Sequence, residues 1–177
     1  MIRQPRKEND QVAVSIFVNP IQFNNPEDLE SYPVDLDNDI EILKKENVDL
    51  VWTPGINDIY PDDYQTYIQV EHISKLLEGQ SRPGHFKGVV TVVAILFNTF
   101  QPDRAYFGQK DAQQALVIQQ MARDLKYNLD IVICPTVRDT DGLAVSSRNK
   151  NLSEQGRIQA VCLHKGLMAA KESIHHG

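Results

Sequence analysis

Short apolar runs rich in β-branched residues alternate along this chain with longer segments of helical periodicity, and that alternation limits the fold more than any other feature. The runs at residues 12–18, 48–52, 105–107 and 130–134 have the length and composition of strands. Residues 12–18 are apolar on both faces, which is typical of a strand buried in a parallel sheet. Repeated β-α-β units imply an α/β fold with a doubly wound parallel sheet and ligands at the carboxyl ends of the strands.

Helices are predicted between and after these strands. Asn25 and Pro26 are typical of an N-cap and a first helical residue, and Ser153 is a second candidate N-cap. The run at residues 89–100 is apolar for too long to be a strand, so it predicts a buried helix. In all, helices are expected at residues 26–46, 89–100, 111–125 and 153–173, and a short edge strand at residues 67–70.

The charge of the chain limits its ligands. With 177 residues and a formal net charge of -6, the protein has little general attraction for nucleic acid or an anionic membrane. An anionic ligand must therefore be met by a local basic cluster, for which the candidates are Arg82, His85, Lys87, Lys110, Arg138 and Arg148.

Cysteine usage and hydropathy indicate a cytoplasmic protein. Cys134 and Cys162 form neither a metal-ligand spacing nor a disulfide framework, so we expect reduced thiols in the core. No apolar run is long enough to span a membrane, and the start of the chain lacks a signal-peptide pattern.

Two segments combine cationic side chains with small hydrogen-bond donors. Lys110 lies within residues 108–114, directly after a predicted strand and at the start of a predicted helix. Backbone NH groups and the positive end of a helix dipole favour an anion there, and the lysine adds a full charge. Residues 145–149 follow another strand and a turn at Gly142. Together the two segments predict a phosphate clamp, the alternative being a solvated lysine and an ordinary polar turn.

Further polar candidates follow the first strand and begin the 111–125 helix. Asn19 and Gln22 lie just past residues 12–18, where their amides could bind a small polar substrate or cap the loop backbone. Gln114 is three residues beyond Asp111, so it could reach the same crevice or be an exposed helix residue.

A loop histidine and a helix carboxylate complete the candidates. His85 is either an acid or base or, more commonly, a structural residue, while the nearby Arg82 is a candidate contact for an anion. Asp39 and Asp111 are candidate ligands for Mg²⁺, although Asp39 fits a solvated helix face equally well.

Several ordered segments carry a family resemblance. They are residues 14–23, 26–29, 32–33, 77–79, 82–86, 108–111, 113–114 and 141–149. In this order they closely resemble the pantoate–β-alanine ligase (pantothenate synthetase) family. The resemblance implies a Rossmann-like domain of the nucleotidylyltransferase type that activates pantoate with Mg²⁺ and ATP to pantoyl adenylate. The amine of β-alanine then attacks the adenylate to give pantothenate and AMP, a step of coenzyme A biosynthesis, in a homodimeric enzyme.

The resemblance also implies roles for single residues. Gln22 and Gln114 match the glutamines that hold pantoate, with Gln22 also near β-alanine and with Asn19 and Arg82 close by. Lys110, Ser146, Ser147 and Arg148 match residues that neutralise charge during adenylate formation. The ATP-binding set is Gly108, Gln109, Lys110, Asp111, Val137, Val145, Ser146, Ser147 and Arg148, in which Gln109 replaces a usual glutamate and Val145 a frequent methionine or leucine. A core position would explain Val137 equally well.

The most serious departure from the family lies at the amino terminus. The family carries a His-x-Gly-His motif before the strand that begins at Val12, and none of the five histidines of this chain precedes Val12. We therefore expect a fragment in which residues 1–150 form a nucleotide- and pantoate-binding domain and residues 151–177 begin the C-terminal lid domain. The chain is expected to begin inside a helix, to bind ATP weakly and to turn over slowly.

Two alternatives stay open at this point. One is another nucleotidylyltransferase of the same fold that acts on a different acid, against which the pair Gln22 and Gln114 argues. The other is a catalytically impaired chain that serves only as a nucleotide-binding or dimerisation module.

Overall fold

The computed structural model describes residues 1–176. Contacts within the chain divide it into two compact units, Met1–Cys134 and Pro135–Gly177. The domain boundary expected after residue 150 stays a prediction.

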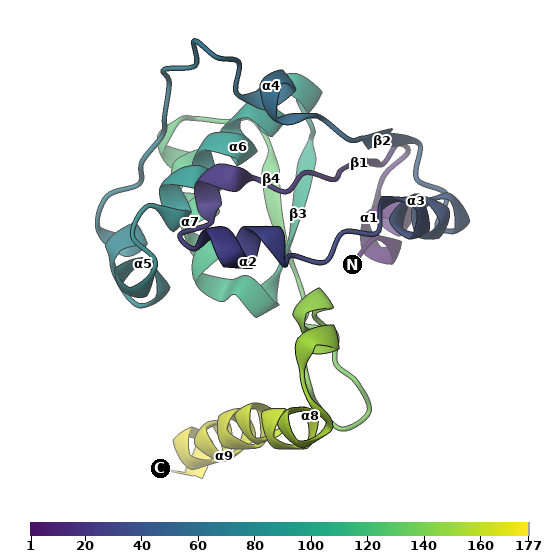
Figure 1. Cartoon of the computed structure of the whole chain (residues 1–177), viewed down its shortest axis with the longest axis vertical. Helices are drawn as coiled ribbons and strands as arrows, with labels where there is room; N and C mark the ends of the chain where they lie inside the picture. Colours follow the sequence, from purple (N-terminus) through teal and green to yellow (C-terminus); the bar gives the residue numbers. More distant parts are fainter. Residues whose placement is uncertain (177) are drawn as a thin grey trace. The chain divides into compact units, whose positions relative to one another are not determined.

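Four strands in the first unit form two parallel pairs (Figure 1). Strand β1 (Ala13–Ser15) pairs with β2 (Leu50–Trp52), and β3 (Arg104–Gly108) pairs with β4 (Asp130–Cys134). Both pairs are parallel, which confirms the α/β class predicted from the alternating pattern. In the part of the chain that the structure describes, the pairs are two separate sheets rather than one.

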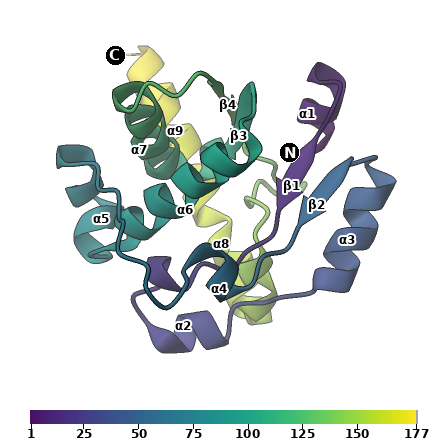
Figure 2. The ribbon, with the colours of Figure 1, turned by 90° about the horizontal axis from the view of Figure 1, so that it is seen from above.

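Helices and 3-10 turns connect and cover the strands. The first unit contains α1 (Arg3–Glu8), η1 (Pro20–Gln22), α2 (Pro26–Glu30), α3 (Leu36–Lys45), α4 (Ile56–Ile59), η2 (His72–Lys75), α5 (Glu78–Ser81), α6 (His85–Phe100), η3 (Gln109–Asp111) and α7 (Ala112–Asp124). The second unit contains η4 (Ser147–Asn151), α8 (Glu154–Ala160) and α9 (Cys162–His176). Figure 2 shows α1 and α3 beside the β1–β2 pair, and α6 and α7 beside the β3–β4 pair.

The predicted helix starts are confirmed where a side chain caps the backbone. The Asn25 side chain accepts a hydrogen bond from the amide of Glu27 at 2.9 Å, and that of Ser153 accepts one from the amide of Gly156 at 3.1 Å. The expected 26–46 helix is in fact two helices. It breaks before Pro33, and Asp35 then caps α3.

Two strand predictions are wrong, one in the length and burial of the strand and one in its existence. Strand β1 is shorter than residues 12–18 and is not buried on both faces, since Ala13 is exposed and β2 is its only partner among residues 1–176. Residues 67–70 form no strand. Instead the amide of Ile68 donates to the hydroxyl of Thr91 on α6 at 3.0 Å.

The core of the first unit lies between α6 and α7. Helix α7 begins and ends within one residue of its predicted positions, whereas α6 ends at the predicted Phe100 but already begins at His85. Helix α6 is buried along most of its length because most of its residues are apolar. Val90, Val117 and Ile118 are completely inaccessible to solvent.

No helix within residues 1–176 is both long enough and apolar enough to cross a bilayer.

Helix α1 is attached to the β1–β2 pair by a shared carboxylate. Asp49 accepts hydrogen bonds from the amide of Val12 at 2.7 Å and from Arg6 at 2.5 Å, and these two contacts lower the pKa of Asp49. Pro5 is tolerated because α1 begins at Arg3, so the proline lies in the first turn, where its missing NH needs no helical partner.

The two cysteines differ in environment. Cys134, at the end of β4, is a buried free thiol whose pKa is raised by burial. Cys162 is also free but exposed, so the expectation of a core position is wrong for it.

Truncation of Ile118 tests the position of the core. Ile118→Ala should lower the free energy of unfolding by about 2–5 kcal/mol because it leaves a cavity at a fully buried site. Leu116→Ala on the same helix is the control, since Leu116 is 59% exposed and its loss should cost about 0.5 kcal/mol or less. Urea denaturation measures both, and equal losses would contradict the assigned core face.

Candidate functional site

The η1 turn carries Gln22 and is held against the first turns of α6. Gly88 makes this approach possible, because a Cβ atom at that position would lie 2.8 Å from the backbone nitrogen of Gln22. The two elements are also tied by hydrogen bonds from Asn19 and His85. The position of Gln22 is therefore fixed by a helix more than sixty residues further along the chain.

Asn19, directly before η1, is almost completely buried and uses both ends of its amide within the protein. Its Oδ1 accepts from the hydroxyl of Tyr60 at 3.0 Å and from the amide of Ile21 at 3.3 Å. Its Nδ2 donates to the carbonyl of Gly88 at 3.0 Å and to Oε1 of Gln22 at 3.3 Å. Burial raises the pKa of Tyr60 to about 12, so its hydroxyl remains a donor at neutral pH.

The other end of the Gln22 amide is available to a ligand. Its Nε2 has no hydrogen-bond partner among residues 1–176, and no buried side-chain nitrogen or oxygen in that part of the chain is unpaired. Nε2 must therefore reach solvent. Gln114, partly buried in the first turn of α7, likewise has an amide without a partner among the described residues.

His85 anchors η1 from the other side and is buried, which favours the structural interpretation of this residue. Its Nδ1 lies 2.7 Å from the carbonyl of Gln22, which can only accept, so Nδ1 carries the proton. Its Nε2 faces Arg82 at 3.3 Å, and Arg82 pairs with Glu78 at 2.7 Å. Burial lowers the pKa of His85, and the charge of Arg82 lowers it further.

Gln113 joins this network to α7. Its Oε1 accepts from the amide of Glu78 at 3.0 Å, while its Nε2 donates to the carbonyls of Ile73 and Leu76. The two consecutive glutamines of α7 therefore have different surroundings, with Gln113 bonded to η2 and α5 and Gln114 left unpaired within the described residues. No sequence pattern signals the role of Gln113 or Tyr60.

The predicted ATP segment of the first unit follows β3. Gly108 ends the strand, Gln109 and Lys110 are exposed on η3, and Asp111 precedes α7. The ammonium of Lys110 lies 3.2 Å from the carboxylate of Asp111, an exposed pair of adjacent residues that a phosphate could displace at small cost.

The predicted ATP segment of the second unit is a turn that leads into η4. Ser146 caps η4 by accepting from the amide of Arg148 at 3.3 Å, and Ser147 and Arg148 are exposed. Val137 and Val145 are joined by a backbone hydrogen bond of 3.0 Å and are both more than half exposed, so a core role for Val137 is wrong.

Gly142 shapes the same turn. It has a φ of 94°, and a Cβ atom there would collide with the ring of His164.

Asp39 lies in the first turn of α3, where a carboxylate favours the positive end of the helix dipole. No group of three or more His, Cys, Asp or Glu side chains within residues 1–176 is arranged to hold a metal ion.

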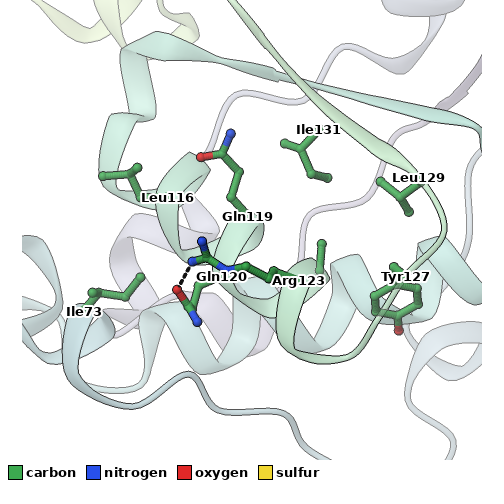
Figure 3. Close-up of a pocket in the computed structure, with 9 residues that line it drawn as sticks. Ile73, Leu116, Gln119, Gln120, Arg123, Tyr127, Leu129 and Ile131 are labelled. Atoms are coloured by element: carbon green, nitrogen blue, oxygen red, sulfur yellow. Dashed lines mark hydrogen bonds between the residues drawn. The ribbon is translucent and has the colours of Figure 1, made fainter.

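A surface pocket in the first unit is lined by none of the predicted site residues (Figure 3). It lies over α7 and the start of β4, where Arg123 donates to the side chain of Gln120. Its lining is Ile73, Leu116, Gln119, Gln120, Ala122, Arg123, Tyr127, Leu129 and Ile131, which includes no predicted site residue.

Known proteins share both the sequence and the fold. A sequence profile for pantoate-beta-alanine ligase matches residues 1–176. The pantothenate synthetase of Syntrophomonas wolfei is 52% identical over 178 residues, a match that covers 100% of this chain and 63% of the relative. The crystal structure of pantothenate synthetase from Thermus thermophilus superimposes with a TM-score of 0.97 at 48% identity, covering 99% of this chain and 64% of that one.

The chain belongs to the pantoate–β-alanine ligase family. It spans about 63% of the length of the curated relatives it matches. The pantoate–β-alanine ligase of Francisella tularensis, solved with β-γ ATP and β-alanine, also superimposes, with a TM-score of 0.88 and 45% identity over 93% of this chain and 63% of that one. The family membership confirms the resemblance and the nucleotidylyltransferase type of fold.

The lowered pKa of His85 predicts an acid-sensitive stability for this ligase-family chain. A neutral His85 fits between the Gln22 carbonyl and Arg82, with Glu78 and Asp111 the acidic groups that oppose the downward shift. Its contribution is therefore complete above the unfolded pKa of about 6.5 and is lost as pH falls through the lower folded value.

The measurement compares wild type with His85→Asn. The difference between their free energies of unfolding should be constant above about pH 7 and should shrink below about pH 6.5. Urea denaturation at a series of pH values measures it, with the points between about pH 7 and pH 8 as the internal control. A difference that stays constant down to about pH 5 would contradict the neutral, buried ring.

Proposed function

We propose that this chain takes part in the ATP-dependent condensation of pantoate with β-alanine, through pantoyl adenylate, with release of AMP and diphosphate. The observation that carries the proposal is the unpaired, solvent-accessible NH2 group of Gln22, whose amide oxygen is held by Asn19, at a position that matches the family's pantoate-binding glutamine. Family membership and the ATP and β-alanine bound to the Francisella relative support it.

The chemistry requires positioning rather than a covalent enzyme intermediate. A carboxylate oxygen of pantoate attacks the α-phosphorus of ATP and diphosphate leaves. The amine of β-alanine then attacks the acyl carbon, and AMP leaves with the bonding electrons. Amide groups of Gln22 and Gln114 would orient the acid, and Asn19 and Arg82 would support Gln22, which lowers the entropy cost of the in-line attack.

Charge neutralisation is the second requirement. The exposed ammonium of Lys110 and the guanidinium of Arg148 are suited to the phosphate oxygens. The hydroxyls of Ser146 and Ser147, the backbone of residues 108–111 and the exposed Val137 and Val145 complete the proposed ATP set.

A magnesium ion bound with ATP would shield the phosphate charge. Nucleotide-bound Mg²⁺ needs only one or two protein carboxylates, so single residues such as Asp39 or Asp111 fit that need without a preformed cluster among the described residues.

Two narrower roles would account for the same residues. In the first, this chain is a nucleotidylyltransferase of the same fold that acts on an acid other than pantoate. In the second, the chain binds nucleotide but does not catalyse a reaction. Titration with pantoate tests the first of these roles, which predicts no pantoate binding. An assay of AMP release from ATP, pantoate and β-alanine tests the second, which predicts ATP binding without turnover.

A homodimer in the cytoplasm is part of the proposal. Sedimentation velocity would detect the dimer.

Removal of one cation tests the ATP site. Lys110→Ala or Arg148→Ala should weaken ATP binding by roughly 1.5–3 kcal/mol, because each removes a charge-assisted contact. Calorimetric titration measures this, with the exposed Lys150→Ala as the control for a general loss of positive charge. Unchanged ATP affinity in both variants would remove these residues from the site.

Removal of either glutamine tests the acid site. Gln22→Ala or Gln114→Ala should weaken pantoate binding far more than ATP binding, by about 1–3 kcal/mol, since a ligand group loses its partner. Gln120→Ala, further along α7, is the control. An equal loss of affinity for both ligands would indicate a structural role instead.

A further inference from the structure

The orientation of the Gln22 amide follows from hydrogen bonds that begin at Tyr60. The hydroxyl of Tyr60 donates to Oδ1 of Asn19, and Nδ2 of Asn19 donates to Oε1 of Gln22. Tyr60 is 8% exposed and 41 residues distant from Asn19 in the sequence, so the contact is purely tertiary.

The direction of each bond is determined by the partners. Oδ1 of Asn19 faces two donors, the Tyr60 hydroxyl and the amide of Ile21, while Nδ2 faces the carbonyl of Gly88, which can only accept. A flipped Asn19 amide would place donors against donors. Gln22 must therefore present its oxygen to Asn19 and its NH2 group to solvent.

We propose that Tyr60 is a positioning residue that acts through Asn19 to turn the Gln22 amide, so that its NH2 group faces the oxygen atoms of the acid substrate. The inference rests on the proposed function for the identity of that substrate. An NH2 group donates to carboxylate and hydroxyl oxygens, whereas a carbonyl oxygen in its place would repel a carboxylate. The relay from Tyr60 through Asn19 to Gln22 thus selects an acid over an amine at this point.

The ring of Tyr60 offers a matched pair of variants. Tyr60 stacks edge-on against Tyr64, with ring centroids 5.0 Å apart, and the hydroxyl of Tyr64 has no hydrogen-bond partner among residues 1–176. Tyr60→Phe removes only the donor to Asn19. Tyr64→Phe removes a hydroxyl from the same aromatic cluster and leaves the relay intact.

A second variant reverses the relay. In Asn19→Asp the new carboxylate still accepts from Tyr60 and Ile21 but can donate neither to Oε1 of Gln22 nor to the carbonyl of Gly88, so circular dichroism and thermal unfolding must first show that the variant keeps the wild-type fold. The Gln22 amide should then turn its NH2 group toward that carboxylate and its oxygen toward the substrate.

The experiment uses two readouts on the purified protein. Hydrogen exchange of the Asn19 side-chain amide, followed by NMR, reports the relay without any ligand. Calorimetric titration with pantoate and, separately, with ATP reports its effect on binding. Tyr60→Phe should speed the exchange of the Asn19 side-chain amide and weaken pantoate binding roughly threefold to tenfold, with ATP affinity unchanged. Asn19→Asp should weaken pantoate binding further. Tyr64→Phe should match wild type in both readouts.

The outcomes separate this inference from the proposed function. Unchanged exchange and pantoate affinity in Tyr60→Phe, or equal losses for pantoate and ATP, would overturn the positioning role. Absence of pantoate binding by the wild type would overturn the proposed substrate, and the exchange rates would still decide whether Tyr60 holds Asn19.

Discussion

The close packing of α6 on the η1 turn is the constraint on which the rest of the first unit depends. Gly88 removes the side chain that would separate the two backbones, and the buried Asn19 then finds its acceptor on α6. A buried amide with a missing partner would cost about 1–3 kcal/mol, so the contact and the hydrogen bonds stabilise each other. The same contact presents Gln22 at the surface.

Gln22 is held by two kinds of contact, one to its backbone and one to its side chain. His85 and Arg82 hold the backbone carbonyl of Gln22, at 2.7 and 3.4 Å, while Asn19 holds its amide oxygen. Backbone anchors fix where the residue lies, and the amide contact fixes which atom it offers. Rigid placement of a binding group lowers the entropy lost when a ligand is captured.

The sequence predicts those parts of the fold that depend on local signals. The positions of α6, α7 and β4 follow from periodicity and β-branched runs, and Asn25 and Ser153 cap helices as their chemistry suggests. Prediction fails where distant residues decide the outcome. Residues 67–70 form no strand, and the amide of Ile68 bonds to the side chain of Thr91 on α6 instead.

In the candidate site, too, local signals could be predicted and contacts between distant residues could not. Gln22 and Gln114 could be selected because each follows a predicted strand or begins a predicted helix. The internal use of Asn19 could not be predicted, since its partner Tyr60 lies in a segment with no recognisable pattern. Pairing of Glu78 with Arg82 fits helical spacing, but the contact of Arg82 with His85 depends on the turn at Gly84.

The two adjacent glutamines at the start of α7 differ in how firmly each is tied to the rest of the first unit. The side chain of Gln113 forms hydrogen bonds with backbone groups of η2 and α5, whereas that of Gln114 forms none with another described residue. Replacement of Gln114 therefore breaks no hydrogen bond among the described residues, while the same change one residue earlier would release the segment that carries Glu78. A variant that probes the proposed acid site should therefore change the second glutamine and leave the first untouched.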